Sequence, residues 1–274
     1  EPVERKTTAP MLAHSYDDHA HTVTYPCYFQ PKLDGVRCIA EMADDRTVTL
    51  WSRQGKIYDA VPHVNEILKD IMTPGEILDG ELYCHGANLQ TLISWVKKAQ
   101  PESQKVQYHV YDMVSDHPFS KRLERIQHLI TKDGSVTRTV FTDKIHSADE
   151  IPEKHGLVVE QGYEGIMLRV GKCEYRCGYR SRELLKVKAF KDAEFEIVGA
   201  EEGKGKSAGQ ATFICKTATG QTFNARPRGE DSLRKAYWQD RDSYVGRKLT
   251  VRYFDLTNDG IPRFPVGIAV REDI

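Results

Sequence analysis

A lysine in a tight turn between two strand-like segments is the feature that most constrains this chain. Residues 24–29 are rich in β-forming side chains, residues 36–42 continue in the same way, and Asp34-Gly35 between them is a turn signal. Taken alone, this pattern is typical of a plain hairpin with a solvated lysine. Lys32 becomes a candidate nucleophile because further polar residues follow it in a fixed order.

Three later strand-like segments carry polar residues. One segment ends in Arg53 before a glycine turn, and residues 77–83 hold Glu81 within an Asp-Gly-Glu run. Residues 106–114 alternate apolar and polar positions and include Tyr111. Each of these alone is commonly a surface arginine, a solvated acid or a packed tyrosine.

The last polar positions of this series lie between residues 164 and 188. Glu164 opens an apolar run that includes Met167, and Lys186 and Lys188 follow on a strand-like segment. Because side chains two apart on a strand share a face, the two ammonium groups point to one place. Such a pair suits a polyphosphate and favours the neutral form of a nearby amine.

Taken in order, these segments resemble the motifs of the covalent nucleotidyltransferases, the superfamily of DNA ligases, RNA ligases and mRNA capping enzymes. The Lys-x-Asp-Gly run at Lys32, with its following arginine, resembles the first motif. The lead-in over residues 10–13 and the arginine-phenylalanine-proline run at 263–265 are similar to those of minimal two-domain ATP-dependent DNA ligases. The resemblance covers almost the whole chain.

The resemblance implies that Lys32 attacks ATP and carries AMP as a lysyl phosphoramidate. In this family Tyr111 and Met167 would sandwich the adenine, and the amide oxygen of Gln30 would accept from its amino group. A Mg²⁺ ion is expected at Glu81 and Glu164. The full set of nucleotide-binding side chains that the resemblance implies is Gln30, Arg37, Arg53, Glu81, Tyr111, Met167, Lys186, Lys188 and Arg271.

The end of the chain departs from the family pattern. The last motif of these ligases ends in Arg-x-Asp-Lys, and Arg271 and Asp273 match it. Ile274 stands where the lysine is expected. The departure concerns the step in which pyrophosphate leaves.

A change of composition near residues 189–192 predicts a domain boundary. The resemblance implies an α+β nucleotidyltransferase (adenylation) domain with antiparallel sheets and helices over residues 1–189. Residues 190–274 show five short strand-like segments with a helix before the last two, which is typical of a small OB-fold β-barrel. Barrels of this type commonly bind nucleic acid. The Gly-Lys-Gly-Lys-Ser run at 203–207 precedes a strand-like segment and not a helix, so we expect a barrel loop and not a phosphate-binding P-loop.

These observations predict an ATP-dependent DNA ligase that seals nicks in duplex DNA through lysyl-AMP and an adenylated 5′-phosphate. The alternatives are an RNA ligase or capping-type nucleotidyltransferase, which share the lysine chemistry, and a catalytically silent nucleic-acid-binding relative. The two ligase-like runs at 10–13 and 263–265 argue against the first two, and the retained lysines argue against the third. A role in repair, replication or recombination is not distinguished by any of these residues.

Bulk properties limit the partners. The formal net charge of −1 neither supports nor excludes nucleic acid, so any basic surface must be local. No apolar run has the length of a membrane span, and the first residues have no signal-peptide core, so we expect no membrane partner and a location in the cytoplasm or wherever the host DNA lies. We also expect a monomer. Six cysteines without a Cys-x-x-Cys pair indicate reduced thiols.

Overall fold

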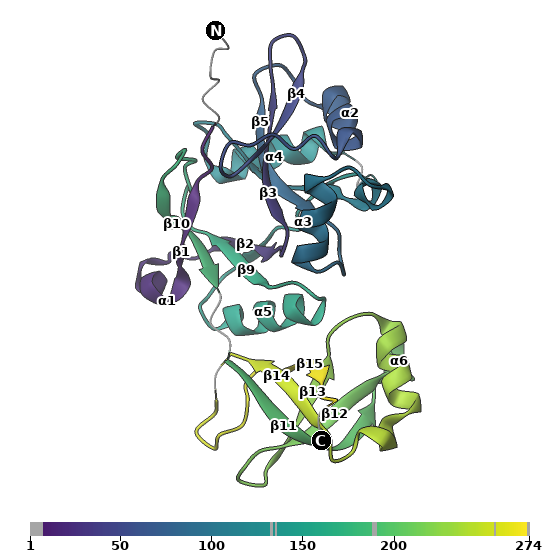
Figure 1. Ribbon diagram of the computed structural model, residues 1–274. Coiled ribbons are helices and arrows are strands. Elements are labelled where there is room, and N and C mark those ends of the chain that lie inside the picture. Colours follow the sequence, from purple (N-terminus) through teal and green to yellow (C-terminus); the bar gives the residue numbers. More distant parts are fainter. Residues whose placement is uncertain (1–7, 132–133, 135, 188–190, 255, 273–274) are drawn as a thin grey trace. The chain divides into compact units, whose positions relative to one another are not determined.

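The computed structural model describes residues 8–131, 134, 136–187, 191–254 and 256–272 (Figure 1). The chain divides into two compact units, one of residues 1–146 and 167–187 and one of residues 147–166 and 188–274. The third and last change of unit, between 187 and 188, lies close to the change of composition. None of the helices in the described ranges is long and apolar enough to cross a membrane.

Two five-stranded sheets form the first unit, in agreement with the expected α+β class. Strands β1 and β10 pair in parallel, as do β6 and β7, whereas β3 pairs with both its neighbours in antiparallel fashion. The first sheet has the order β1 (Leu12–Ser15), β10 (Arg180–Val187), β9 (Gly165–Arg169), β2 (Cys27–Lys32), β8 (Asp143–Ile145). The second has the order β4 (Val48–Ser52), β3 (Val36–Met42), β5 (Ile77–Tyr83), β6 (Gln107–Met113), β7 (Thr137–Thr139).

The turn after Lys32 carries the chain from one sheet to the other. Lys32 is the last residue of β2, and β3 begins at Val36 in the second sheet, so the plain hairpin is excluded. Gly35 in this turn lies against β5. A Cβ at Gly35 would be 2.5 Å from Cγ of Glu81 and 2.7 Å from the carbonyl oxygen of Leu82. The turn therefore needs glycine because the adjacent strand leaves no room for a side chain.

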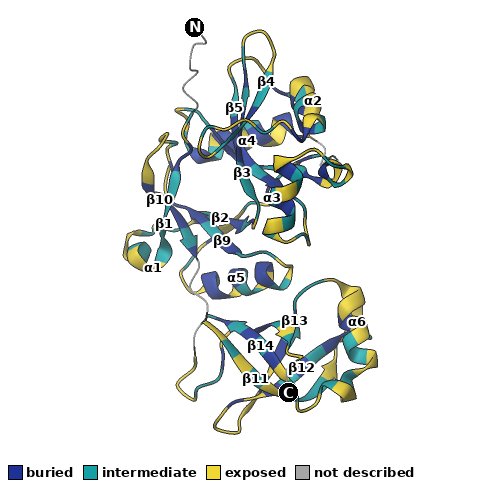
Figure 2. Ribbon diagram, in the orientation of Figure 1, coloured by how far each residue is buried: buried dark blue, intermediate teal, exposed yellow. Residues whose placement is uncertain are grey.

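Three amphipathic helices share a buried core with the second sheet. Their apolar side chains recur at helical spacing, and Val64, Leu92 and Ile126 are fully buried in one cluster with residues of β5 and β6. Figure 2 shows the ribbon coloured by burial. Asn88 caps the second of these helices, since its side-chain oxygen accepts from the backbone N–H of Thr91 at 2.9 Å. The helical segments of this unit are α1 (Tyr16–His19), the 3₁₀ turn η1 (Ala20–Thr22), α2 (Pro62–Ile71), α3 (Leu89–Lys97), the 3₁₀ turn η2 (Pro101–Lys105) and α4 (Phe119–Leu129).

The second unit contains a closed five-stranded barrel, as the OB-fold pattern predicts. Strand β11 closes it by pairing with both β12 and β14, and its interior is apolar, with Ile197, Phe213 and Val251 fully buried. The barrel order is β11 (Lys191–Glu202), β12 (Ala211–Lys216), β13 (Thr222–Pro227), β15 (Val266–Val270), β14 (Lys248–Tyr253). The helical segments of this unit are α5 (Glu150–Glu160), η3 (Gly205–Ser207), α6 (Asp231–Gln239) and η4 (Arg241–Tyr244). The Gly-Lys-Gly-Lys-Ser run forms the loop with η3, and strand β12 follows it, so no helix N-terminus is present for a P-loop.

Candidate active site

A cavity of about 640 Å³ lies in the first unit and is lined by strands of both its sheets. Helix α3 adds an apolar wall formed by Leu89, Ile93 and Val96. Segments far apart in the sequence therefore meet at one space. The side chains that sequence reasoning selected and that line this cavity are Gln30, Lys32, Arg37, Arg53, Glu81, Tyr111, Met167 and Lys186.

Lys32 and Glu81 approach this cavity from different sheets. Lys32 is half-buried at the end of β2, and Glu81 projects from β5, where Gly35 packs against it. Desolvation raises the pKa of Glu81 to about 8, although the positive charges of Arg37 and Lys32 act to lower it. Tyr111 donates its hydroxyl to Oε2 of Glu81 at 3.3 Å. At neutral pH this carboxyl is therefore largely protonated, and a bound cation would favour its ionised form.

The Glu81 carboxyl suits a hard divalent cation. Mg²⁺ takes oxygen ligands and is commonly held by one or two carboxylates, with water and substrate phosphates completing its shell. The donor at Glu81 fits that description. In the described ranges no group of three or more His, Cys, Asp or Glu side chains is arranged to hold a metal ion.

Arg37 is fixed by a bidentate ion pair. It donates from Nε to Oδ1 of Asp79 at 3.0 Å and from Nη2 to Oδ2 at 2.6 Å. Desolvation would lower the pKa of Arg37, but Asp79 keeps it well above its usual value. The hydroxyl of Tyr175 also donates to Oδ2 of Asp79, at 2.7 Å, and accepts from the backbone N–H of Met11 at 3.3 Å. The lead-in strand is thereby tied to the wall of the cavity.

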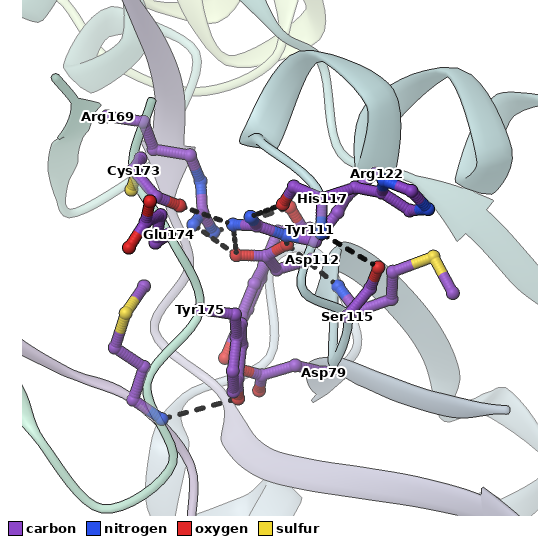
Figure 3. A network of polar contacts seen from close by, with 12 residues as sticks. Asp79, Tyr111, Asp112, Ser115, His117, Arg122, Arg169, Cys173, Glu174 and Tyr175 are labelled. Atoms are coloured by element: carbon purple, nitrogen blue, oxygen red, sulfur yellow. Dashed lines mark hydrogen bonds and ion pairs between the residues drawn. The ribbon is translucent and has the colours of Figure 1, made fainter. Parts of the chain in front are cut away.

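A second buried network is centred on Asp112, directly after Tyr111 (Figure 3). Arg122 donates from Nε to Oδ1 at 2.7 Å and from Nη2 to Oδ2 at 3.0 Å. Arg169 donates from Nη1 to the same Oδ2, so two guanidinium groups share one fully buried carboxylate. Arg169 also reaches the cavity, where its Nε donates to Oε1 of Gln30 at 2.8 Å.

Two of the expected site residues lie elsewhere, and a third is outside the described residues. Glu164 directly precedes β9 and belongs to the second unit, and it is absent from the described residues that line the cavity. Arg271 is exposed after β15, also in the second unit, with its Nε 3.4 Å from Oε1 of Glu194. Lys188 lies outside the described residues.

Sequence reasoning missed the residues that hold the cavity-lining side chains, such as Arg37 and Gln30, in place. Asp79 and Arg169 stand inside motifs that were noted for their neighbours, and their burial at 1% and 2% exposure marks them as paired charges. Tyr175, which donates to Asp79, and Thr142, whose hydroxyl accepts from Nε2 of Gln30, stand in segments without a motif. A buried charge is visible in a sequence only as an acid or base within an apolar run, as at Arg169, and nothing comparable signals Tyr175.

Comparison with known proteins gives the same family for both parts of the chain. The model described as "ATP dependent DNA ligase domain" matches residues 10–188, and the one described as "DNA ligase OB-like domain" matches residues 202–271. A DNA ligase of African swine fever virus is 29% identical over 266 residues, covering 89% of this chain and 63% of that protein. A DNA ligase of Halobacterium salinarum is 26% identical over 291 residues, covering 89% of this chain and 51% of that protein. The chain thus spans 63% of the length of the viral relatives.

Solved structures agree with these matches. The crystal structure of Chlorella virus DNA ligase-adenylate superposes with a TM-score of 0.79 at 26% identity, covering 98% of this chain and 100% of that one. The bacteriophage T7 ATP-dependent DNA ligase, in a complex with ATP, superposes with a TM-score of 0.64 at 18% identity, covering 97% and 99% of the two chains. At 18% identity, the similarity to the bacteriophage T7 enzyme concerns the fold alone.

Proposed function

Because the chain belongs to the family of ATP-dependent DNA ligase domains, whose model matches residues 10–188, we propose that it joins DNA strands at nicks through a covalent lysyl-AMP intermediate. The observation that carries this proposal is the convergence of Lys32, Glu81, Tyr111 and Lys186 on one cavity. A nucleophile, a carboxyl, an aromatic platform and a cation in one space are what nucleotidyl transfer to a side chain needs.

The reaction consists of three transfers. The Lys32 amine, having lost its proton, attacks the α-phosphorus of ATP; a P–N bond forms and the P–O bond to pyrophosphate breaks. An oxygen of the DNA 5′-phosphate then attacks the same phosphorus, so the P–N bond breaks and lysine regains its proton. In the last step the 3′-hydroxyl attacks the 5′-phosphorus, loses its proton, and displaces AMP.

The chain's own residues divide this work. Tyr111 and Met167 would enclose the adenine, since an aromatic face and a thioether offer apolar surfaces to a purine. Lys186 and Arg53 are the cations that would bind the phosphates, because guanidinium and ammonium groups stabilise charge that grows on a transferring phosphoryl group. Lys188 and Arg271 are further candidate phosphate-binding cations by the family resemblance alone.

Arg37 would act differently from the other cations. The N–H of Nε and one N–H of Nη2 are already used by Asp79, so the two N–H donors of Nη1 and the second of Nη2 remain to reach a phosphate oxygen. The pair with Asp79 holds the guanidinium plane in a fixed direction for that contact.

Glu81 would hold Mg²⁺, which when bound neutralises charge on the transferring phosphate, and Glu164 is a second candidate ligand by the family resemblance alone. Because the pKa of the Glu81 carboxyl is about 8, its ionisation for this role depends on the positive charge of the bound cation. We further propose residues 1–189 as the adenylation domain, residues 190–274 as the OB-fold domain that contacts nicked duplex, and a cytoplasmic monomer as the working form.

Sealing of a nicked duplex tests the proposal. The full chain with ATP and Mg²⁺ should convert a labelled nicked strand to its full length, and the Lys32→Ala variant should not. GTP in place of ATP, and an RNA strand in place of DNA at the nick, should each give little product. Efficient sealing with GTP or only of RNA would assign the chain to a different nucleotidyltransferase activity.

A further inference from the structure

The side-chain amide of Gln30 is held by three hydrogen bonds at the wall of the cavity. Its Nε2 donates to the carbonyl oxygen of Tyr111 at 3.1 Å and to Oγ1 of Thr142 at 2.9 Å. Its Oε1 accepts from Nε of Arg169 at 2.8 Å. Gln30 is 1% exposed and lines the cavity, so the amide has little freedom and faces the same space as Lys32.

The direction of this amide is determined by the chemistry of its partners. A guanidinium can only donate, and a backbone carbonyl can only accept. Rotating the amide of Gln30 by half a turn would place its NH₂ group against the N–H of Arg169 and its oxygen against the carbonyl of Tyr111. Both hydrogen bonds would be lost inside a buried site, where unpaired polar groups are costly.

Arg169 is itself fixed, so it can hold Gln30 in one orientation. Its Nη1 donates to the fully buried carboxylate of Asp112, and its Nη2 donates to the carbonyl oxygen of Tyr111 at 3.3 Å. The guanidinium carbon lies 4.4 Å from the centre of the Phe119 ring. Figure 3 shows Arg169 and Arg122 both directed at Asp112. A group with this many partners does not turn away when a ligand arrives.

We propose that Arg169 is a positioning residue that makes the base pocket selective for adenine over guanine. This inference rests on the proposed function, with the base bound beside Gln30. The second lone pair of Oε1 accepts from the amino group that adenine carries at position 6. Guanine carries an oxygen there, which can only accept, so it meets Oε1 without a donor between them. The amide cannot rotate to offer its NH₂ group because Arg169 holds its oxygen.

Transfer of label from nucleotide to protein measures this selectivity. The full chain is incubated with ATP or GTP labelled at the α-phosphate, and the rate of protein labelling is compared at equal concentrations. In Arg169→Met the amide loses the donor that holds its oxygen, and only the hydrogen bond from Nε2 to the Tyr111 carbonyl still opposes rotation. The ATP:GTP ratio of rates should therefore fall about 10- to 100-fold, mainly through faster reaction with GTP. The same ratio in Arg169→Met and in the parent chain would overturn the proposal.

Arg122→Met is the matched control. It removes the other guanidinium from Asp112, and among the described residues its contacts do not include Gln30. It should lower the melting temperature as Arg169→Met does, while the ATP:GTP ratio stays at the parent value. An equal fall of the ratio in both variants would mean that general loosening of the network explains the change.

A double-substitution cycle tests whether Arg169 acts through Gln30. Gln30→Met removes both the oxygen and the NH₂ group of the side-chain amide, so Arg169→Met should cause no further change of the ATP:GTP ratio in that background. An undiminished effect of Arg169→Met there would show that Arg169 acts independently of Gln30.

Thr142→Val decides the question if Arg169→Met does not fold. Thr142 lies at the surface end of the same network and accepts from Nε2 of Gln30. The variant should show a smaller fall of the ATP:GTP ratio in the same direction, and an unchanged ratio would count against the proposal. A parent chain that takes no label from ATP would instead refute the proposed function, whereas normal labelling with unchanged ratios in all variants would refute only the role of Arg169.

Discussion

Two arginine–aspartate pairs in this protein have nearly the same geometry in different surroundings. Arg37 donates two hydrogen bonds to Asp79, at 3.0 and 2.6 Å, and Arg252 donates two to Asp192, at 2.8 and 2.7 Å. Both pairs join neighbouring antiparallel strands. The Asp79 side chain is 1% exposed and that of Asp192 is 40% exposed. Burial, and not the geometry of the pair, is what separates them.

The comparison extends to the two units. Around the cavity of the first unit, Asp79 and Asp112 each hold more than one donor and are closed off from water. On the barrel, charged side chains such as Lys204 and Lys206 are exposed around an apolar interior. Buried charges of the first kind fix the positions of the side chains they bind, while exposed charges of the second kind would interact with a polyanion in a salt-dependent manner.

The largest effect of a single substitution is expected at Asp112. Asp112→Ala leaves the guanidinium groups of Arg122 and Arg169 buried without their shared carboxylate. Breaking a buried pair in this way costs about 3 to 5 kcal/mol. Chemical denaturation of the first unit, followed by tyrosine or tryptophan fluorescence, measures the loss. A loss of less than about 1 kcal/mol would mean that this buried network contributes no more to stability than an exposed ion pair does.

Gly35→Ala should lower the rate of adenylation more than it lowers the free energy of unfolding. The new methyl group would meet Glu81 and the backbone of β5, so the turn after Lys32 has to shift. A displacement of about 1 Å at a reacting group costs about 100-fold in rate. The rate of label transfer from ATP should therefore fall by about that factor. Retention of the parent rate would show that the position of the turn is not critical.

Matched substitutions of the two ion pairs test the opening comparison directly. Asp79→Asn should cost about 1.5 to 3 kcal/mol, because a charged hydrogen bond is lost in a buried place. Asp192→Asn, with the same change of chemistry, should cost less than about 1 kcal/mol. The melting temperatures of the two variants at low and high salt provide the measurement, and equal shifts would break the comparison.

A pH-dependent effect is expected from Glu81. Its pKa is about 8 in the folded chain, whereas the ordinary value for a glutamate side chain is 4.5. Below the lower value the carboxyl is protonated in both states. Between the two values the unfolded chain releases the proton and the folded chain keeps it, so the free energy of unfolding falls as pH rises and levels off above the higher value.

Glu81→Gln removes this contribution. Without nucleotide or metal, the melting temperature of the parent chain should decline by several degrees more than that of the variant between about pH 5 and pH 8. Other titrating groups affect both chains alike, so the difference between the two curves isolates Glu81. Parallel curves would indicate that its carboxyl ionises at an ordinary pH.

Local pattern was enough to predict the barrel and the segments of the cavity. Period-two alternation marks strands such as β6, and helical spacing with the Asn88 cap marks α3, because both signals lie within a few residues. The pattern could not assign strands to sheets. The turn at Asp34-Gly35 has the chemistry of a hairpin, yet β2 and β3 lie in different sheets because their partners come from distant segments.

The same limit applies to the site. The residues expected to contact nucleotide were found by motif, but their supports were not. Arg169 meets Gln30 and Asp112 across long stretches of sequence, and only the folded chain brings these side chains together. Which charges hold one another is a property of the tertiary structure and leaves no local pattern.

The central claim is that Lys32 accepts adenylate in the cavity of the first unit. The most direct test is to incubate the full chain with ATP and a divalent cation, digest it, and locate the added AMP by mass spectrometry. The account predicts a single adenylated peptide with the modification on Lys32. AMP attached to any other side chain, or no attachment while strand joining proceeds, would contradict it.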